Sequence, residues 1–284
     1  MRPPNWFGGP RSFGTPKIYC RRSLSFSAAS HGYFMFLTKA NNSIFDGLLA
    51  LLYPQACVVC QKSVESRQLG VVCASCWQQT RIFSSADTLC WKCGAHSLGA
   101  SAPDQKEVIR CRRCDEHAYT AARACGAYEG ALRAVVLALK REPHLPRRLA
   151  ELLIKTQALP PLNEATLVIP VPLHPQREKS RGFNQAKAIA SVIAAAASLP
   201  LDVASLIRTS HAEVHRAGLD ARGRRDTVAD AFQVSYSKLV DGERVLLVDD
   251  VFTTGATVSA CAEALREAGA REVFVLTIAR PIRY

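Results

Sequence analysis

Residues 245–257 read VLLVDDVFTTGAT and decide the fold of this chain. The stretch opens on consecutive apolar side chains, which is typical of a strand buried on both faces of a parallel sheet. Asp249 and Asp250 follow directly, and the rest of the stretch is a small, hydroxyl-rich loop. Residues 258–268 then repeat apolar side chains at helical spacing. The stretch predicts a strand, a loop and a helix, with two carboxylates where open α/β sheets bind ligands.

The chemistry of the predicted loop favours a bound phosphate. Backbone N–H groups of the loop and of the helix start attract an anion, and the helix dipole adds to this attraction. Glycine lets the backbone approach the ligand closely, and threonine hydroxyls add donors. Two carboxylates beside a phosphate need partners of their own, and ribose hydroxyls are suitable because they donate. The sequence thus predicts a phosphorylated sugar, with its phosphate on Thr253, Thr254, Gly255, Ala256 and Thr257 and its ribose on Asp249 and Asp250.

The chain after Cys114 alternates apolar runs with helical periods. This alternation predicts an α/β domain with a mainly parallel sheet. The expected strands are residues 124–128, 166–171, 244–248 and 273–278, and the expected helices are residues 132–140, 147–159, 186–197 and 258–268.

The cysteines are concentrated upstream of this domain. Each Cys-x-x-Cys turn supplies two thiolates to a tetrahedral zinc ion, so four such turns predict two four-cysteine sites, a double zinc ribbon. Whether consecutive or interleaved turns share a zinc does not follow from their spacing. The expected ligands are Cys57, Cys60, Cys73, Cys76, Cys90, Cys93, Cys111 and Cys114.

Other interpretations of the cysteine pairs are disulfides and redox chemistry. Disulfides suit a secreted chain, and a redox Cys-x-x-Cys normally occurs once, so structural zinc is favoured. The segment has little apolar material and needs metal to fold. Such a ribbon either packs on its neighbour or contacts nucleic acid, and its modest positive charge favours packing.

The formal net charge of +12 suggests a polyanionic partner. Part of the charge lies in the first residues, since no acidic residue precedes Asp46. This basic segment is interpreted as a solvated tail, as a targeting segment, or as sequence upstream of a true start near Met35. We expect residues 1–43 to be a disordered leader, residues 44–116 to be the zinc ribbons and residues 117–284 to be the α/β domain.

Several motifs together resemble a known family. Residues 245–257 resemble the ribose-phosphate signature of type I phosphoribosyltransferases at every position. Residues 168–175 read VIPVPLHP, Gly-Phe-Asn-Gln follows at 182–185, and the cysteine turns precede both. This order is similar to that of the ComF family, competence-associated bacterial proteins with a phosphoribosyltransferase-like domain. Arg216 and Thr227 depart from the pattern, because family members often have Gln and Asn there.

The resemblance implies phosphoribosyl pyrophosphate (PRPP) and Mg²⁺ as ligands. It assigns the ribose to Asp249 and Asp250 and the 5′-phosphate to residues 253–257. Basic side chains near the strand ends are expected to contact the pyrophosphate, with Arg177, Arg181 and Lys140 as candidates and a solvated basic surface as the alternative. Asn184 and Gln185 begin a helix, so either a capping role or a ligand role is open for them.

Three functions are compatible with these residues. The first is a Mg²⁺-dependent phosphoribosyltransferase whose acceptor the sequence does not reveal. The second is a catalytically silent module that binds PRPP and regulates, and the third is a factor that handles single-stranded DNA or competence proteins during DNA uptake. No apolar run is long enough to span a membrane, and we expect a cytoplasmic protein.

Overall fold

The computed structural model describes residues 55–84, 87, 90–95, 111, 114–209 and 231–282. The expected leader lies outside these residues, as do Arg216, Thr227 and the basic cluster at 222–225. Within the described part of the chain, no helix is both long enough and apolar enough to cross a membrane.

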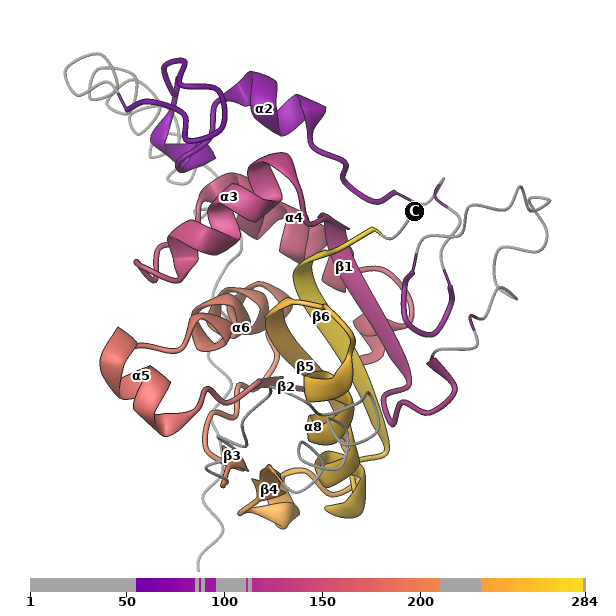
Figure 1. Cartoon of the computed structure of the whole chain (residues 1–284). Coiled ribbons are helices and arrows are strands. Elements are labelled where there is room, and N and C mark those ends of the chain that lie inside the picture. The colour runs from indigo at the N-terminus through magenta and orange to yellow at the C-terminus, as the bar shows by residue number, and fades with distance from the viewer. Residues whose placement is uncertain are drawn as a thin grey trace, which may run out of the picture. The chain divides into compact units, whose positions relative to one another are not determined.

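A four-stranded parallel sheet forms the centre of the fold (Figure 1). Its strands run in the order β1-β6-β5-β2, and every neighbouring pair is parallel. The strands are β1 (Ala121–Ala127), β6 (Glu272–Arg280), β5 (Arg244–Val251) and β2 (Leu167–Pro170). Because all strands point the same way, their carboxyl ends meet at one edge, as the sequence predicts for the acid pair.

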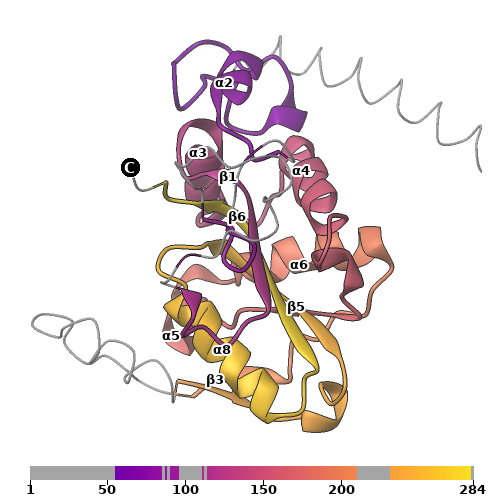
Figure 2. The ribbon, with the colours of Figure 1, turned by 90° about the vertical axis from the view of Figure 1, so that its right-hand side faces the viewer.

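Helices cover both faces of the sheet (Figure 2). One core holds side chains of α3 (Gly130–Leu139), α4 (Arg147–Gln157) and α6 (Gln185–Ala197), and the core on the other face holds those of α8 (Ala256–Glu267). Alternate residues of β5 serve the two cores: Leu246 and Val248 belong to the first, and Val245 and Leu247 to the second. The unbroken apolar run is therefore explained by burial on both sides.

Shorter elements complete the domain. Residues 175–181, which carry several basic side chains, form a short helix that starts at a proline and has Gly182 as its C-cap. The short elements are η1 (Arg67–Leu69), α2 (Ala74–Gln79), η4 (Leu162–Glu164), α5 (Pro175–Arg181), η5 (Ser237–Leu239) and the antiparallel pair β3 (Leu206–Arg208) and β4 (Phe232–Val234).

The central strand β5 is longer than the sequence predicts. Its pairing with β6 continues through Asp249, opposite Thr277, to Val251, opposite Ala279. Both acidic residues therefore belong to the end of strand β5 and not to the loop that follows it. Since side chains alternate along a strand, Asp249 and Asp250 point to opposite faces of the sheet.

The two cysteine clusters pack with different cores. Trp77, beside the first cluster, lies in the core of α3 and α4, whereas Cys90, Cys93 and Cys114 lie in the core of α8. The connecting residues 81–83 run along the free edge of β1, where the Phe83 N–H donates to the Cys125 carbonyl over 2.9 Å. The chain thus passes from one face of the sheet to the other along this edge.

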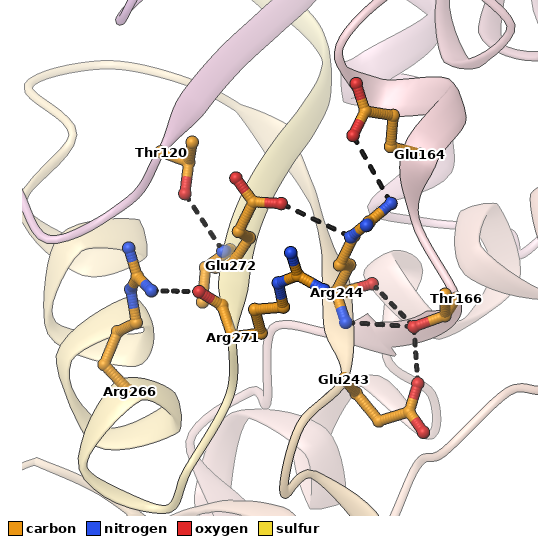
Figure 3. A network of polar contacts seen from close by, with 9 residues as sticks. Thr120, Glu164, Thr166, Glu243, Arg244, Arg266, Arg271 and Glu272 are labelled. Carbon is orange, nitrogen blue, oxygen red and sulfur yellow. Dashed lines mark hydrogen bonds and ion pairs between the residues drawn. The ribbon is translucent and has the colours of Figure 1, made fainter.

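A polar network closes the amino ends of the strands (Figure 3). Arg244, at the start of β5, forms ion pairs with Glu272 over 3.5 Å and with Glu164 over 3.4 Å. The Thr166 hydroxyl donates to Glu243 and accepts from the Arg244 N–H over 2.9 Å. These charges satisfy one another, so this end of the sheet is held by its own side chains.

Candidate functional site

The acid pair lies at the carboxyl end of β5 and contacts a predicted basic residue. The Asp250 side chain is buried, and its Oδ2 lies 3.5 Å from the Lys140 Nζ. Lys140 is the C-cap of α3, so the helix end places its ammonium group above the strand. The Asp250 N–H also donates to Asp249 Oδ1 over 2.8 Å, which fixes the first carboxylate against the backbone.

Gln185 joins a second predicted basic residue to the acid pair. Its Nε2 donates to Asp250 Oδ2 over 3.2 Å, and its Oε1 accepts from the Arg181 guanidinium. A chain of contacts therefore runs from Arg181 through Gln185 and Asp250 to Lys140. Arg177, on the same short helix as Arg181, has an exposed side chain.

The role of the Asn184-Gln185 pair, which the sequence left open, is divided between the two residues. Asn184 caps α6, since its Oδ1 accepts from the Ala186 N–H over 2.9 Å and its Nδ2 donates to the Val171 carbonyl over 3.0 Å. Those bonds hold the helix start against the end of β2. Gln185 contacts Asp250 instead, and the ligand role that the sequence left open for it stays a prediction.

The ionisation of Asp249 is unfavourable. Burial, and then the neighbouring Asp250 charge, raise the pKa of Asp249 to about 7, although Lys140 opposes this shift. Adjacent carboxylates of this kind are stabilised by groups that donate or by a cation. The site therefore favours a ligand rich in hydroxyl groups or one that arrives with a metal ion.

The loop after β5 has the geometry of an anion site. Gly255 is the N-cap of α8 with φ of 84°, a left-handed conformation that favours glycine. A Cβ at this position would lie 2.7 Å from the Phe252 ring and 3.2 Å from His117 Nε2, so a larger residue does not fit. Thr253, Thr254 and Thr257 are exposed, and α8 is a full helix whose first N–H groups begin at this loop.

The eight predicted ligand cysteines form two clusters of consecutive pairs. Within each cluster the ligand atoms lie within 4.8 Å of one another. The Sγ atoms of Cys90 and Cys114 are 3.5 Å apart, as are those of Cys60 and Cys73. Tetrahedral zinc with bonds of about 2.3 Å places its sulfur ligands about 3.8 Å apart, so both clusters fit this ion. The structure thereby resolves the pairing that the spacing left open.

Neighbouring thiols in the second cluster have strongly different acidities. The Cys93 thiol donates to Cys90 and lowers the pKa of Cys90 to about 4, whereas burial raises the pKa of Cys114 to about 12. Thiolates packed this closely need a cation to ionise together. The donor set is therefore that of a structural zinc site.

Sheet, acid pair, loop and cysteine clusters together define a phosphoribosyltransferase-like domain that follows a double zinc ribbon. Residues 155–283 match the phosphoribosyl transferase domain family, and residues 48–127 match the double zinc ribbon domain family.

Two curated relatives are named for competence and for DNA utilization. The chain is 37% identical to competence protein F of Haemophilus influenzae over 114 residues, 40% of this chain and 49% of that protein. It is 27% identical to DNA utilization protein YhgH of Escherichia coli strain K12 over 240 residues, 82% of this chain and 100% of that protein. The chain thus spans about half the length of competence protein F and the whole of YhgH.

A solved structure shows a weaker likeness. The glutamine PRPP amidotransferase from B. subtilis, complexed with ADP and GMP, is 25% identical with a TM-score of 0.32, over 49% of this chain and 26% of that one.

The chain is a homologue of competence protein F and of YhgH that combines a double zinc ribbon with a phosphoribosyltransferase-like domain. The predicted resemblance to the ComF family is confirmed, as is the predicted α/β fold with a parallel sheet flanked by helices.

Proposed function

We propose that this chain binds PRPP with Mg²⁺ at the carboxyl end of the sheet. The observation that carries the proposal is the placement of Asp250, which Lys140 and Gln185 hold beside the glycine-capped start of α8. In this proposal the 5′-phosphate binds to residues 253–257, and Asp249 and Asp250 accept hydrogen bonds from the ribose hydroxyls. Asp249, whose ionisation is unfavourable in the buried site, gains hydrogen-bond donors when the sugar binds.

The pyrophosphate of PRPP is assigned to the basic side of the site. Lys140 and Arg181 lie at either end of the chain of contacts through Asp250, and Arg177 is exposed nearby on α5. Mg²⁺ binds mainly through substrate phosphates and water in sites of this kind and supplies charge neutralisation there. Arginine and lysine stabilise the same phosphates by charge-assisted hydrogen bonds.

The proposed reaction is phosphoribosyl transfer. An acceptor forms a bond to the anomeric carbon, the bond from that carbon to the pyrophosphate oxygen breaks, and pyrophosphate leaves with the electron pair. The alternative is a silent PRPP-binding regulator, which retains the same contacts without turnover. We assign the protein to the cytoplasm, because four unbridged Cys-x-x-Cys pairs suit a reducing compartment.

Titration calorimetry with PRPP and Mg²⁺ tests the proposal. The wild-type protein is expected to bind, and Asp250→Ala is expected to lose binding while retaining the unfolding transition of the wild type. No binding by the wild type contradicts the proposal. Where binding occurs, pyrophosphate release measured with a panel of bases and amines separates a transferase from a regulator.

A second candidate function is the handling of single-stranded DNA during DNA uptake. It is favoured by relatives whose names refer to competence and DNA utilization. Binding of fluorescent oligothymidylate at several salt concentrations tests it, since phosphate contacts give an affinity that falls with salt. Displacement of the oligonucleotide by PRPP places both ligands in one basic site, and independent binding separates them.

A further inference from the structure

The loop after β5, residues 252–257, is called the phosphate loop below, because the proposed function places a phosphate on it. It packs against the second ribbon, which holds the cysteine cluster of Cys90, Cys93, Cys111 and Cys114. This contact involves a histidine that the function above does not use. His117 lies in the segment that leaves Cys114, and its N–H donates to the Cys114 carbonyl over 3.3 Å. Lys92, between two other ligands of the same cluster, donates from Nζ to the His117 carbonyl over 2.7 Å. The backbone of His117 is therefore held from both sides of the second cluster.

An aromatic contact carries this position to the loop. The His117 ring stacks on Tyr119 with centroids 5.1 Å apart, and Tyr119 meets the ring of Phe252 edge-on at 6.0 Å. Phe252 is the first residue after β5. On Phe252 also lies the guanidinium of Arg280, 4.9 Å from the ring centroid, and the same guanidinium donates to the Cys93 carbonyl. The loop is thus clamped by Tyr119 and Arg280, and both partners are attached to the second cluster.

Two further contacts join the ribbon segment to the start of α8. The Ala118 N–H donates to the Ser259 hydroxyl over 3.1 Å. His117 Nε2 occupies the space that a side chain at Gly255 would need. The first cluster has no comparable position among the described residues, because it packs with the core of α3 and α4. Its matching link is the Thr80 hydroxyl, which accepts from the Ala131 N–H over 2.8 Å.

We propose that His117 is a positioning residue for the phosphate loop. In this proposal, metal binding by the second cysteine cluster, but not by the first, holds the loop in its phosphate-binding geometry. This inference rests on the proposed function, since it assigns a phosphate to that loop. A metal ion in the second cluster fixes Cys93 and Cys114, and through them Arg280, His117 and Tyr119. These contacts then hold Phe252 and Gly255 in a single loop conformation.

The test uses full-length protein and variants that spare every cysteine. His117→Ala and Ser259→Ala remove contacts between the second ribbon and the loop, and Thr80→Ala is the matched control on the first ribbon. Zinc content is measured first and is expected to equal that of the wild type in all variants. Hydrogen–deuterium exchange of residues 252–259 is expected to rise in the first two variants only, and their PRPP dissociation constant is expected to rise about tenfold.

Substitution of one cysteine in each cluster tests separately whether each metal site affects the loop. Cys114→Ser is expected to release one zinc and to raise exchange in residues 252–259, whereas Cys76→Ser is expected to release one zinc without this effect. Equal exchange and equal PRPP affinity in wild type, His117→Ala and Ser259→Ala overturn the proposal. If the wild type binds no PRPP, the proposed function fails, and the exchange measurement alone then decides whether the second ribbon positions the loop.

Discussion

The two ends of the parallel sheet differ in how their charges are satisfied. At the amino end, Arg244 pairs with Glu164 and Glu272, and Thr166 joins the neighbouring strands (Figure 3). At the carboxyl end, in the part of the chain that the structure describes, Lys140 pairs with Asp250, one of two adjacent carboxylates. The charges at the amino end are satisfied by one another, whereas the carboxyl end has two adjacent carboxylates beside a loop with exposed threonine hydroxyl groups. This difference supports the carboxyl end as the ligand site that we propose.

The largest expected effect comes from Gly255→Ala. The left-handed φ and the close Phe252 ring leave no room for a Cβ, so the loop must move and PRPP binding is expected to fall at least about 100-fold. Gly242→Ala is the control near the amino end, because Gly242 has φ of 75° but nothing within 4 Å of the added Cβ. It is expected to lower the free energy of unfolding by about 1 kcal/mol from strain and to leave binding unchanged. Calorimetry and thermal unfolding of both variants measure the contrast.

Lys140→Met is expected to weaken PRPP binding by about 30-fold, because it removes a charge-assisted contact and leaves Asp250 without its cation. Arg244→Met is the matched change at the amino end. There the ion pairs are partly exposed, so a small loss of stability with unchanged PRPP affinity is expected. An equal loss of affinity in both variants would remove the distinction between the two ends.

The affinity for PRPP is expected to fall as the pH is lowered from 8 to 6, by up to about tenfold per pH unit below the pKa of Asp249. Burial raises this pKa to about 7, and ribose hydroxyls favour the ionised carboxylate, so protonation competes with binding. The raised pKa also means that the contribution of Asp249 to folding is present at low pH and is lost as the pH rises through about 7. Calorimetry across this range measures the slope.

Asp249→Asn is the control for that slope, because PRPP has a titrating phosphate of its own. The variant retains the ligand's titration but lacks the carboxyl group. Its affinity is expected to depend less on pH than that of the wild type, and an identical dependence would assign the effect to the ligand.

The smallest effect is expected for Thr166→Val at the amino end. The change removes the hydroxyl that accepts from the Arg244 N–H, and the exposed site limits the cost to about 0.5–1 kcal/mol of unfolding free energy. Chemical denaturation measures this loss. PRPP affinity equal to that of the wild type is expected, and a reduced affinity would show that the two ends are coupled.

Much of the fold and part of the candidate site could be predicted from local sequence. The apolar run ending in Asp249 and Asp250 predicted a buried strand with acids at its end, because burial on both faces requires apolar side chains throughout. The cysteine spacing predicted two four-ligand clusters, because each short turn brings two sulfurs together. Both features depend on residues close to one another in the chain.

Contacts between segments far apart in the chain could not be predicted from local sequence. Gln185 meets Asp250 across 65 positions, and no spacing rule relates these residues. His117 lies beside the loop after β5 only because the second ribbon packs on the core of α8. The extension of β5 through Asp249 likewise depended on the neighbouring strand β6, which continues the hydrogen-bond ladder.

The sequence by itself determined the chemistry of this protein: the acid pair, the glycine and threonine loop, and eight thiolates in four turns. The tertiary structure alone decided which groups meet, including the consecutive pairing of the cysteine turns, the Lys140–Asp250–Gln185 contacts and the seat of the second ribbon beside the loop. The physical reason is that residue type and local spacing set what a side chain can do. Its partners are set by packing, which joins segments far apart in the chain.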